Sequence, residues 1–323
     1  MSDRLKKILL YAVAAPLFFL FSLVVGAYWT FPYDHVRDFI VQEVERGGTT
    51  QLEIGSLEPS WVTGVELEDV TVSTVPEDDS EPQRMVIPHA QARVSLLSLL
   101  GGSTALTYSV ELPGNGSIEG EYEATEETTH VVASLDNVRL AAIGPLSSSI
   151  GLPVYGTAEG EIDMTIGAEA VNTEGTAELT IEDLALADGE TPLVIQNMGS
   201  QGLTLERMEL GTLTFRLEAE RGNGQIEALH AAGEHAELWG TGSLRLAQPF
   251  ERSSLDILFR IAFADAYKNS SPRMQGLFAL LEVNPQVRPA RTPNGAFQWR
   301  ITGSMGGRIR MVPSGRAPMP EAE

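Results

Sequence analysis

Apolar and polar residues alternate with a period of two along most of the chain from Gln51 to Met311, between turns rich in glycine and proline. This alternation is typical of antiparallel strands that bury one face, so it predicts a mainly β fold with on the order of a dozen strands. The most regular runs supply the candidate residues for an apolar groove or partner face: Leu213, Phe215, Leu217, Leu255, Ile257, Phe259, Ile261 and Phe263.

Helical patterns are few and short in the same region. Ser271-Pro272 predicts the start of one helix that carries Met274, Leu277 and Phe278, and Tyr33 to Arg46 predicts another. Apolar surface left in water costs about 25 cal/mol per Å², and these helices cannot cover a dozen strands. The sheet must therefore curl over its own apolar face. Base rates for all-β proteins slightly favour a closed core, and an open apolar groove is the alternative.

A second feature precedes the β region. Residues Ile8 to Trp29 contain no charged side chain, and a helix of this length reaches roughly 33 Å, enough to cross a bilayer. Arg4, Lys6 and Lys7 come before it, which predicts an N-terminus in the cytoplasm and an exported body. A cleaved signal peptide is the alternative, but the apolar run is longer than the roughly 7 to 15 residues of the apolar h-region of a signal peptide.

These signals predict four parts. Residues 1–7 form a cytoplasmic N-terminus, residues 8–29 a transmembrane helix, residues 31–312 a β-rich domain, and residues 313–323 a disordered tail. The acidic run from Pro76 to Pro82 is expected to be a loop rather than a calcium site, because it lacks the glycine of an EF-hand loop.

The charge of the chain is strongly acidic, with a formal net charge of −22 at pH 7. Such a field repels nucleic acid and acidic lipid headgroups, so neither is expected as a ligand. The chain has no cysteine, which excludes disulfides, thiolate metal sites and thiol nucleophiles.

Motifs for catalysis are absent from the sequence. The segment from His230 to His235 contains two histidines, but a zinc protease needs them on one helix face and this segment contains a glycine between strand patterns. We therefore expect hairpin surface there, no cofactor, no metal site and no enzyme activity.

The order of features resembles the type II secretion system protein N family of bacteria. The resemblance rests on the apolar span, on Phe31-Pro32-Tyr33-Asp34, and on the run from Trp61 to Val70. Further support comes from three longer segments, at residues 150–166, 240–268 and 276–305. These segments are also similar to the AsmA-like group of β proteins.

The resemblance implies a protein of the bacterial inner membrane whose main body lies in the periplasm. It implies a long, curved, mostly antiparallel sheet, an AsmA-like half-pipe or flattened barrel, with a few short helices. The implied function is an accessory role in type II secretion, in contact with other secretion subunits of the inner membrane and periplasm. The alternative is a lipid-binding or lipid-transfer module whose sheet holds phospholipid acyl chains.

Overall fold

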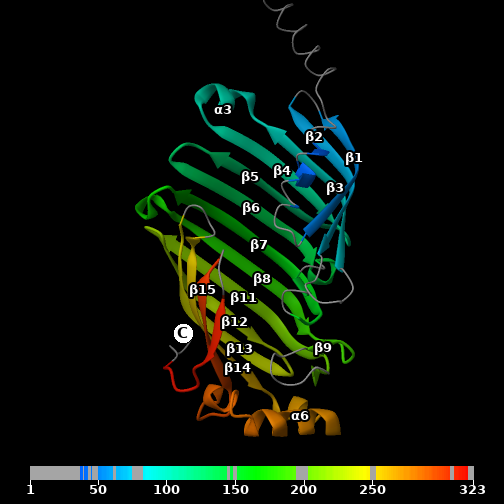
Figure 1. The fold of residues 1–323 in the computed structure, drawn as a ribbon, viewed down its shortest axis with the longest axis vertical. Coiled ribbons are helices and arrows are strands. Elements are labelled where there is room, and N and C mark those ends of the chain that lie inside the picture. Colours follow the sequence, from blue (N-terminus) through cyan, green and yellow to red (C-terminus); the bar gives the residue numbers. More distant parts are fainter. Residues whose placement is uncertain are drawn as a thin grey trace, which may run out of the picture.

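A computed structural model describes residues 37–38, 40–42, 45, 50–60, 63–74, 83–143, 146–147, 151–193, 203–247, 252–305 and 309–318 of the protein. One sheet of 14 strands dominates it (Figure 1). Its strands, in spatial order, are β1 (Thr50–Ser60), β2 (Gly64–Thr74), β3 (Gln83–Val94), β4 (Thr104–Leu112), β5 (Gly116–Ala124), β6 (Thr128–Arg139), β7 (Val154–Gly167), β8 (Glu174–Leu186), β11 (Met208–Glu220), β12 (Asn223–Ala232), β13 (Ala236–Arg245), β14 (Ser254–Phe263), β15 (Phe297–Ser304) and β16 (Arg310–Pro313).

Every neighbouring pair in this sheet is antiparallel, and the spatial order follows the sequence order. Only β9 (Pro192–Leu193) and β10 (Leu203–Thr204) pair separately, in the connection between β8 and β11. The prediction of a mainly β, antiparallel fold is confirmed. The sheet is open, with β1 and β16 at its two edges, so the closed arrangement that base rates favoured is not the one formed.

Among the described residues the helices are few and short, as predicted. Those with assigned bounds are α3 (Leu96–Gly101), α5 (Asp265–Lys268), α6 (Pro272–Val283) and the 3₁₀ turns η1 (Leu140–Ala142), η2 (Ala170–Asn172) and η4 (Arg288–Ala290). The predicted N-cap of the longest one is confirmed, because the Ser271 hydroxyl accepts a hydrogen bond from the Met274 N–H at 3.2 Å. None of the helices among the described residues is both long and apolar enough to cross a membrane. The predicted span at residues 8–29 lies outside the described residues.

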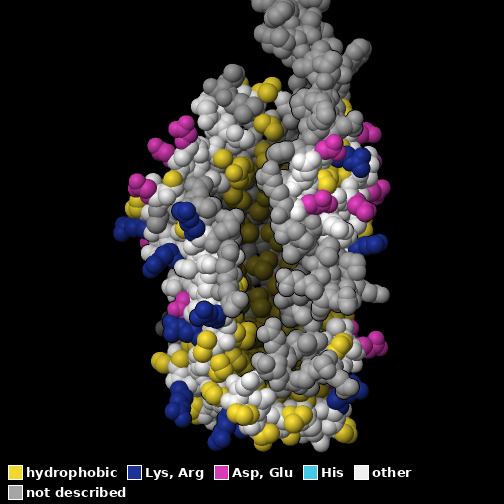
Figure 2. Space-filling model, in the orientation of Figure 1, with side chains coloured by type: hydrophobic (Ala, Val, Ile, Leu, Met, Phe, Trp, Pro, Cys, Tyr) yellow, Lys and Arg dark blue, Asp and Glu magenta, His cyan; other side chains and the backbone are white. Residues whose placement is uncertain are grey.

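The sheet curls because several strands contain an extra residue in left-handed conformation. Asp69, Asn137, Asp183 and Gly211 have φ values of 53°, 49°, 52° and 69°. The pairing register shifts beside Asn137 and Gly211. At the first of these shifts, Leu135 and Val138 on β6 face the same side although they are three positions apart. Bulges of this kind bend a strand and increase its twist, so they help to turn the sheet into a trough. The hollowed face is visible in Figure 2.

Two buried clusters lie at opposite ends of the strands, on the two long sides of this trough. The larger cluster collects the strand ends on the side of α6, where Leu210, Ala231, Met274 and Phe278 are buried. The smaller one joins Met164, Ala219 and Leu246 at the opposite strand ends. Helix α6 lies at the lower end of the sheet in Figure 1 and packs through the larger cluster.

The N-terminal end has a core of its own. Leu52, Ile54 and Val70 are buried there, and Ile40 and Val41 pack against them. Residues 37–38, 40–42 and 45 are helical, which agrees with the helix predicted at Tyr33 to Arg46. The acidic loop predicted at Pro76 to Pro82 lies outside the described residues.

The start of the predicted disordered tail is packed rather than free. Gln298 is fully buried on β15, and its side-chain amide donates hydrogen bonds of 2.8 Å to the carbonyls of Ser314 and Ala317. Gly315 is buried as well, and its N–H donates to the carbonyl of Pro289. Residues 314–318 therefore belong to the fold, because a buried amide needs these carbonyls as partners. Residues 319–323 lie outside the described part.

Candidate functional site: an apolar trough

One row of side chains crosses the hollow face of the whole sheet, with one residue from each of its 14 strands. In spatial order this central row consists of Leu57, Leu67, Ala90, Val110, Ile118, Leu135, Gly160, Leu179, Phe215, Leu229, Gly240, Phe259, Trp299 and Pro313. None of these side chains carries a charge or an amide. At about 4.8 Å between strands, the row is about 60 Å long.

A second row runs beside the first, two residues along each strand. It consists of Pro59, Val65, Ala92, Tyr108, Gly120, Ala133, Ile162, Ala177, Leu217, Ile226, Gly242, Ile257, Ile301 and Met311. Its one polar side-chain group is the hydroxyl of Tyr108, which donates to the Val132 carbonyl at 3.4 Å. The trough is therefore apolar along its full length.

The central row is accessible rather than sealed. All of its members are half-buried, and none is fully buried. The strand ends on both sides are buried by contrast, as Leu210 and Ala219 show on β11. A dry core would bury its middle most deeply. The middle of the face is thus an open trough, and yellow side chains line its floor in Figure 2.

The predicted groove residues lie on the same face of two strands, β11 and β14, and β12 and β13 lie between these strands. Phe215 and Phe259 belong to the central row, whereas Leu217 and Ile257 belong to the second row. Leu213 pairs across the strands with Ala231, Ala231 with Leu238, and Leu238 with Ile261. Leu213 and Ile261 therefore belong to a third row, on the side of α6. Leu255 and Phe263 lie at the two ends of β14 on the same face, and Phe263 joins the larger cluster.

Two glycines on the inward face, Gly240 and Gly120, lie where a Cβ atom would clash with a neighbouring group. A Cβ atom on Gly240 would lie 2.1 Å from Cδ2 of Leu229, so this side chain occupies the space above the glycine. A Cβ on Gly120 would lie 2.1 Å from the Val132 carbonyl and 2.5 Å from the Tyr108 hydroxyl. Tyr108 therefore lies over Gly120, a cross-strand arrangement that compensates for the missing side chain.

Sequence reasoning missed the larger part of the trough, in β1 to β8. Leu179 and Ile118 belong to the same central row as Phe215. The signal was present, because these strands alternate in the same way. It was overlooked because their inward residues are smaller and include Ala90 and Gly160, so no single strand looks strongly apolar.

Polar contacts attach α5 and the start of α6 to Glu206, in the segment that leads into β11. Tyr267 is buried, and its hydroxyl donates a 2.6 Å hydrogen bond to the carbonyl of Glu206. Burial, followed by the nearby Glu206 carboxylate, raises the pKa of Tyr267 to about 12. The Ser271 and Ser270 hydroxyls both donate to the Glu206 carboxylate, which lowers the pKa of Glu206. This end of the trough is therefore held by buried packing and by specific hydrogen bonds.

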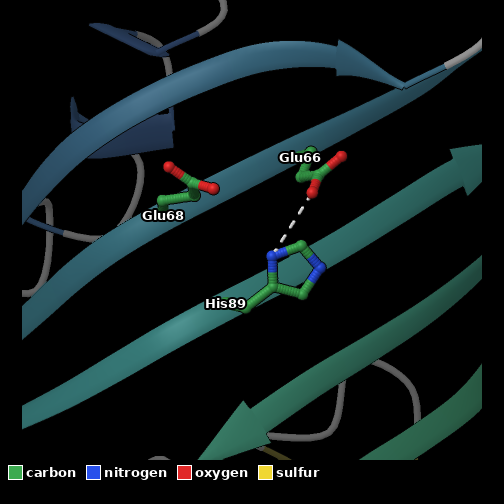
Figure 3. A group of neighbouring side chains, drawn as sticks. All are labelled: Glu66, Glu68 and His89. Carbon is green, nitrogen blue, oxygen red and sulfur yellow. Dashed lines mark ion pairs between the residues drawn. The ribbon is translucent and has the colours of Figure 1, made fainter.

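One group of side chains on the polar face has the composition of a metal site. Glu66 and Glu68 on β2 and His89 on β3 place one ligand atom each within 4.8 Å of one another (Figure 3). Nδ1 of His89 lies 3.5 Å from Oε1 of Glu66, and Glu68 is exposed. Ion pairs at such an exposed position contribute about 1 kcal/mol at most. The geometry is explained by a surface ion pair between neighbouring strands.

The histidines near residue 230 also lie at the surface, as the sequence indicated. Nε2 of His230 lies 3.2 Å from Glu237 on the next strand. His235 lies in the turn between β12 and β13, where its Nδ1 accepts a hydrogen bond from the Glu209 N–H. The two histidines contact different residues, so they do not form one metal-binding site.

Comparisons of the chain with family models, curated proteins and solved structures found no match. The resemblance to the type II secretion system protein N family stays a prediction.

Proposed function

We propose that the protein is a non-enzymatic lipid-binding module of the bacterial cell envelope, and that its trough holds phospholipid acyl chains. The observation that carries this proposal is the central row, which is apolar on all 14 strands and half-buried throughout. Exposed apolar area of this extent costs about 25 cal/mol per Å². An acyl chain on the trough floor would remove that cost.

The chemistry of the sheet favours acyl chains over an extended peptide. Strand β11, which carries Phe215, pairs with β8 on one side and with β12 on the other, so its backbone N–H and C=O groups are already used within the sheet. A ligand lying on the face finds no backbone partners there. A peptide would leave its own buried amide groups unsatisfied, at about 1 to 3 kcal/mol for each group, whereas an acyl chain has none to satisfy.

The experiment compares two faces of the same two strands. Leu179 and Phe215 lie opposite each other in the trough, and Thr180 and Thr214 lie opposite each other on the polar face. The full chain, purified in mild detergent, is analysed by mass spectrometry for bound phospholipid. We expect the Leu179→Asp/Phe215→Asp variant to retain much less phospholipid than the wild type. The Thr180→Asp/Thr214→Asp variant should retain as much as the wild type.

Lipid that is bound elsewhere on the chain contributes equally to both variants, so it does not affect the difference between them. Equal lipid retention in the two variants, with both folded by circular dichroism, would overturn the proposal. A co-purified peptide in place of phospholipid would overturn it as well.

A second proposal follows from the open edges of the sheet and from the resemblance described above. Strand β16 pairs only with β15 and carries the exposed residues Met311 and Val312, while β1 pairs only with β2 among the described residues. Unpaired edges are templates for strand addition by a partner. As an accessory of type II secretion at the inner membrane, the protein would contact other secretion subunits through such an edge. Failure to co-purify with those subunits from its native membrane would count against this role.

A further inference from the structure

The charges of the chain are strongly segregated along the sequence. Residues 245–323 contain 11 of the 22 Lys and Arg residues but only 6 of the 44 Asp and Glu residues. Their net charge is therefore +5, and that of residues 1–244 is −27. In Figure 2 dark blue side chains predominate over the lower half of the molecule and magenta ones over the upper half. Repulsion of acidic headgroups is expected for an evenly spread negative charge, and this charge is not evenly spread.

Three of these basic residues line a cleft between α6, η4 and the segment after β16. Val283, Arg288, Arg291, Pro313 and Arg316 contribute to its lining, and its volume is about 930 Å³. Arg291 is paired with Glu282 at 3.2 Å. Arg288 and Arg316 are exposed and make no ion pair with the residues that the structure describes. Arg310 on β16 is exposed in the same way.

Large exposed apolar side chains lie on the same elements, and one of them, Val283, lines the cleft together with Arg288 and Arg316. Leu280 and Val283 on α6 are 58% and 73% exposed, and Val312 on β16 is 50% exposed. Figure 2 shows yellow side chains along the lower edge, where Figure 1 places α6. Exposed apolar groups surrounded by basic side chains are typical of surfaces that lie on a membrane, where the apolar groups enter the headgroup region and the cations meet anionic lipids.

We propose that this end of the molecule, formed by α6, η4 and β16, docks on the surface of a bilayer that contains anionic phospholipid. The inference goes beyond lipid binding in the trough and does not depend on it. A membrane surface satisfies both properties of the patch together, since it offers negative charge for Arg288, Arg310 and Arg316 and an apolar interior for Val283.

The test is a vesicle-tethering measurement with the full chain. The protein is reconstituted in neutral phosphatidylcholine vesicles and mixed with labelled target vesicles of either phosphatidylcholine or 70% phosphatidylcholine with 30% phosphatidylglycerol, and co-flotation is measured. We expect tethering of the anionic targets only, and its loss at high salt. The Arg288→Gln/Arg310→Gln/Arg316→Gln variant should weaken tethering by roughly a hundredfold, at about fivefold for each arginine.

The matched control removes the same charge elsewhere. Arg84, Arg93 and Arg221 are exposed and lie outside the basic part of the chain, and their triple glutamine variant should tether like the wild type. Equal tethering of neutral and anionic targets, or equal loss in the two triple variants, would overturn the proposal. A Val283→Asp variant tests the apolar contribution and should also lose tethering. Phospholipid retention in the trough is measured on the same samples and should not change, so failure of docking is distinguishable from failure of the proposed function.

Discussion

The hydroxyl of Tyr267 donates a hydrogen bond to the backbone carbonyl of Glu206, 61 residues earlier in the chain, at 2.6 Å. The bond joins α5 to the segment that leads into β11. Because the ring is buried beside Phe263 and Phe278, ionisation of Tyr267 is unfavourable in the folded state.

The first prediction concerns stability at alkaline pH. The pKa of Tyr267 is raised to about 12 in the folded protein, against an ordinary value of 10.0. The neutral tyrosine therefore contributes stability that is fully present below pH 10 and is lost as the pH rises towards 12. We expect the free energy of unfolding to fall by about 2 to 3 kcal/mol over this range. Denaturant titrations of the wild type and Tyr267→Phe measure it, and the same slope in both would contradict the assignment.

The second prediction concerns the attachment of α6. Ser271 caps the helix and also donates to Glu206, whereas Ser270 donates to Glu206 without capping. Loss of an N-cap costs about 1 kcal/mol, so Ser271→Ala should speed amide exchange in α6 by about fivefold or more. Ser270→Ala is the control, with a smaller effect. Equal exchange in the two variants would show that the cap does not hold the helix.

Acid should loosen the same attachment. The hydrogen bonds from Ser271 and Ser270 lower the pKa of Glu206, so its carboxylate contributes stability above the ordinary Glu pKa. That contribution is lost as the pH falls through the lowered value. The protection factors of the α6 amides, which are corrected for the intrinsic pH dependence of exchange, should therefore fall at low pH in the wild type, and Glu206→Gln should remove this fall. A pH dependence that persists in Glu206→Gln would contradict this cause.

Much of the fold could be predicted from the sequence because the alternation is local. Phe215 and Leu217 indicate the inward face of β11 without any knowledge of its neighbours. Whether the sheet closes is a property of all strands together, and it depends on bulges such as those at Asn137 and Gly211. The packing of residues 314–318 was missed because it depends on one distant buried side chain, Gln298. The basic character of residues 245–323 was missed because one net charge for the whole chain does not show how basic and acidic residues are distributed along it.

The fourth prediction concerns Gly240, above which the side chain of Leu229 lies. The atom closest to a new Cβ there belongs to the flexible side chain of Leu229 rather than to the backbone, so a larger residue can be accommodated by moving Leu229 into the trough. Gly240→Leu should obstruct the trough at β13 and reduce phospholipid retention while the protein stays folded. Gly276→Leu on α6 is the control, since a Cβ there meets nothing within 4 Å. Equal retention by both variants would argue against lipid at β13.

The central claim is that acyl chains lie on the inward face of the sheet. Phe259 and Leu258 are neighbours on β14, but Phe259 belongs to the central row and Leu258 pairs with Arg300 and Thr241 on the other face. The most direct measurement is photolabelling of the reconstituted full chain with a phospholipid whose acyl chain carries a photoreactive group, followed by peptide mapping. We predict adducts on inward residues of β11 to β15 in the wild type and in Leu258→Glu, and at least a tenfold loss in Phe259→Glu. Adducts spread equally over both faces, or unchanged in Phe259→Glu, would contradict an acyl-chain trough.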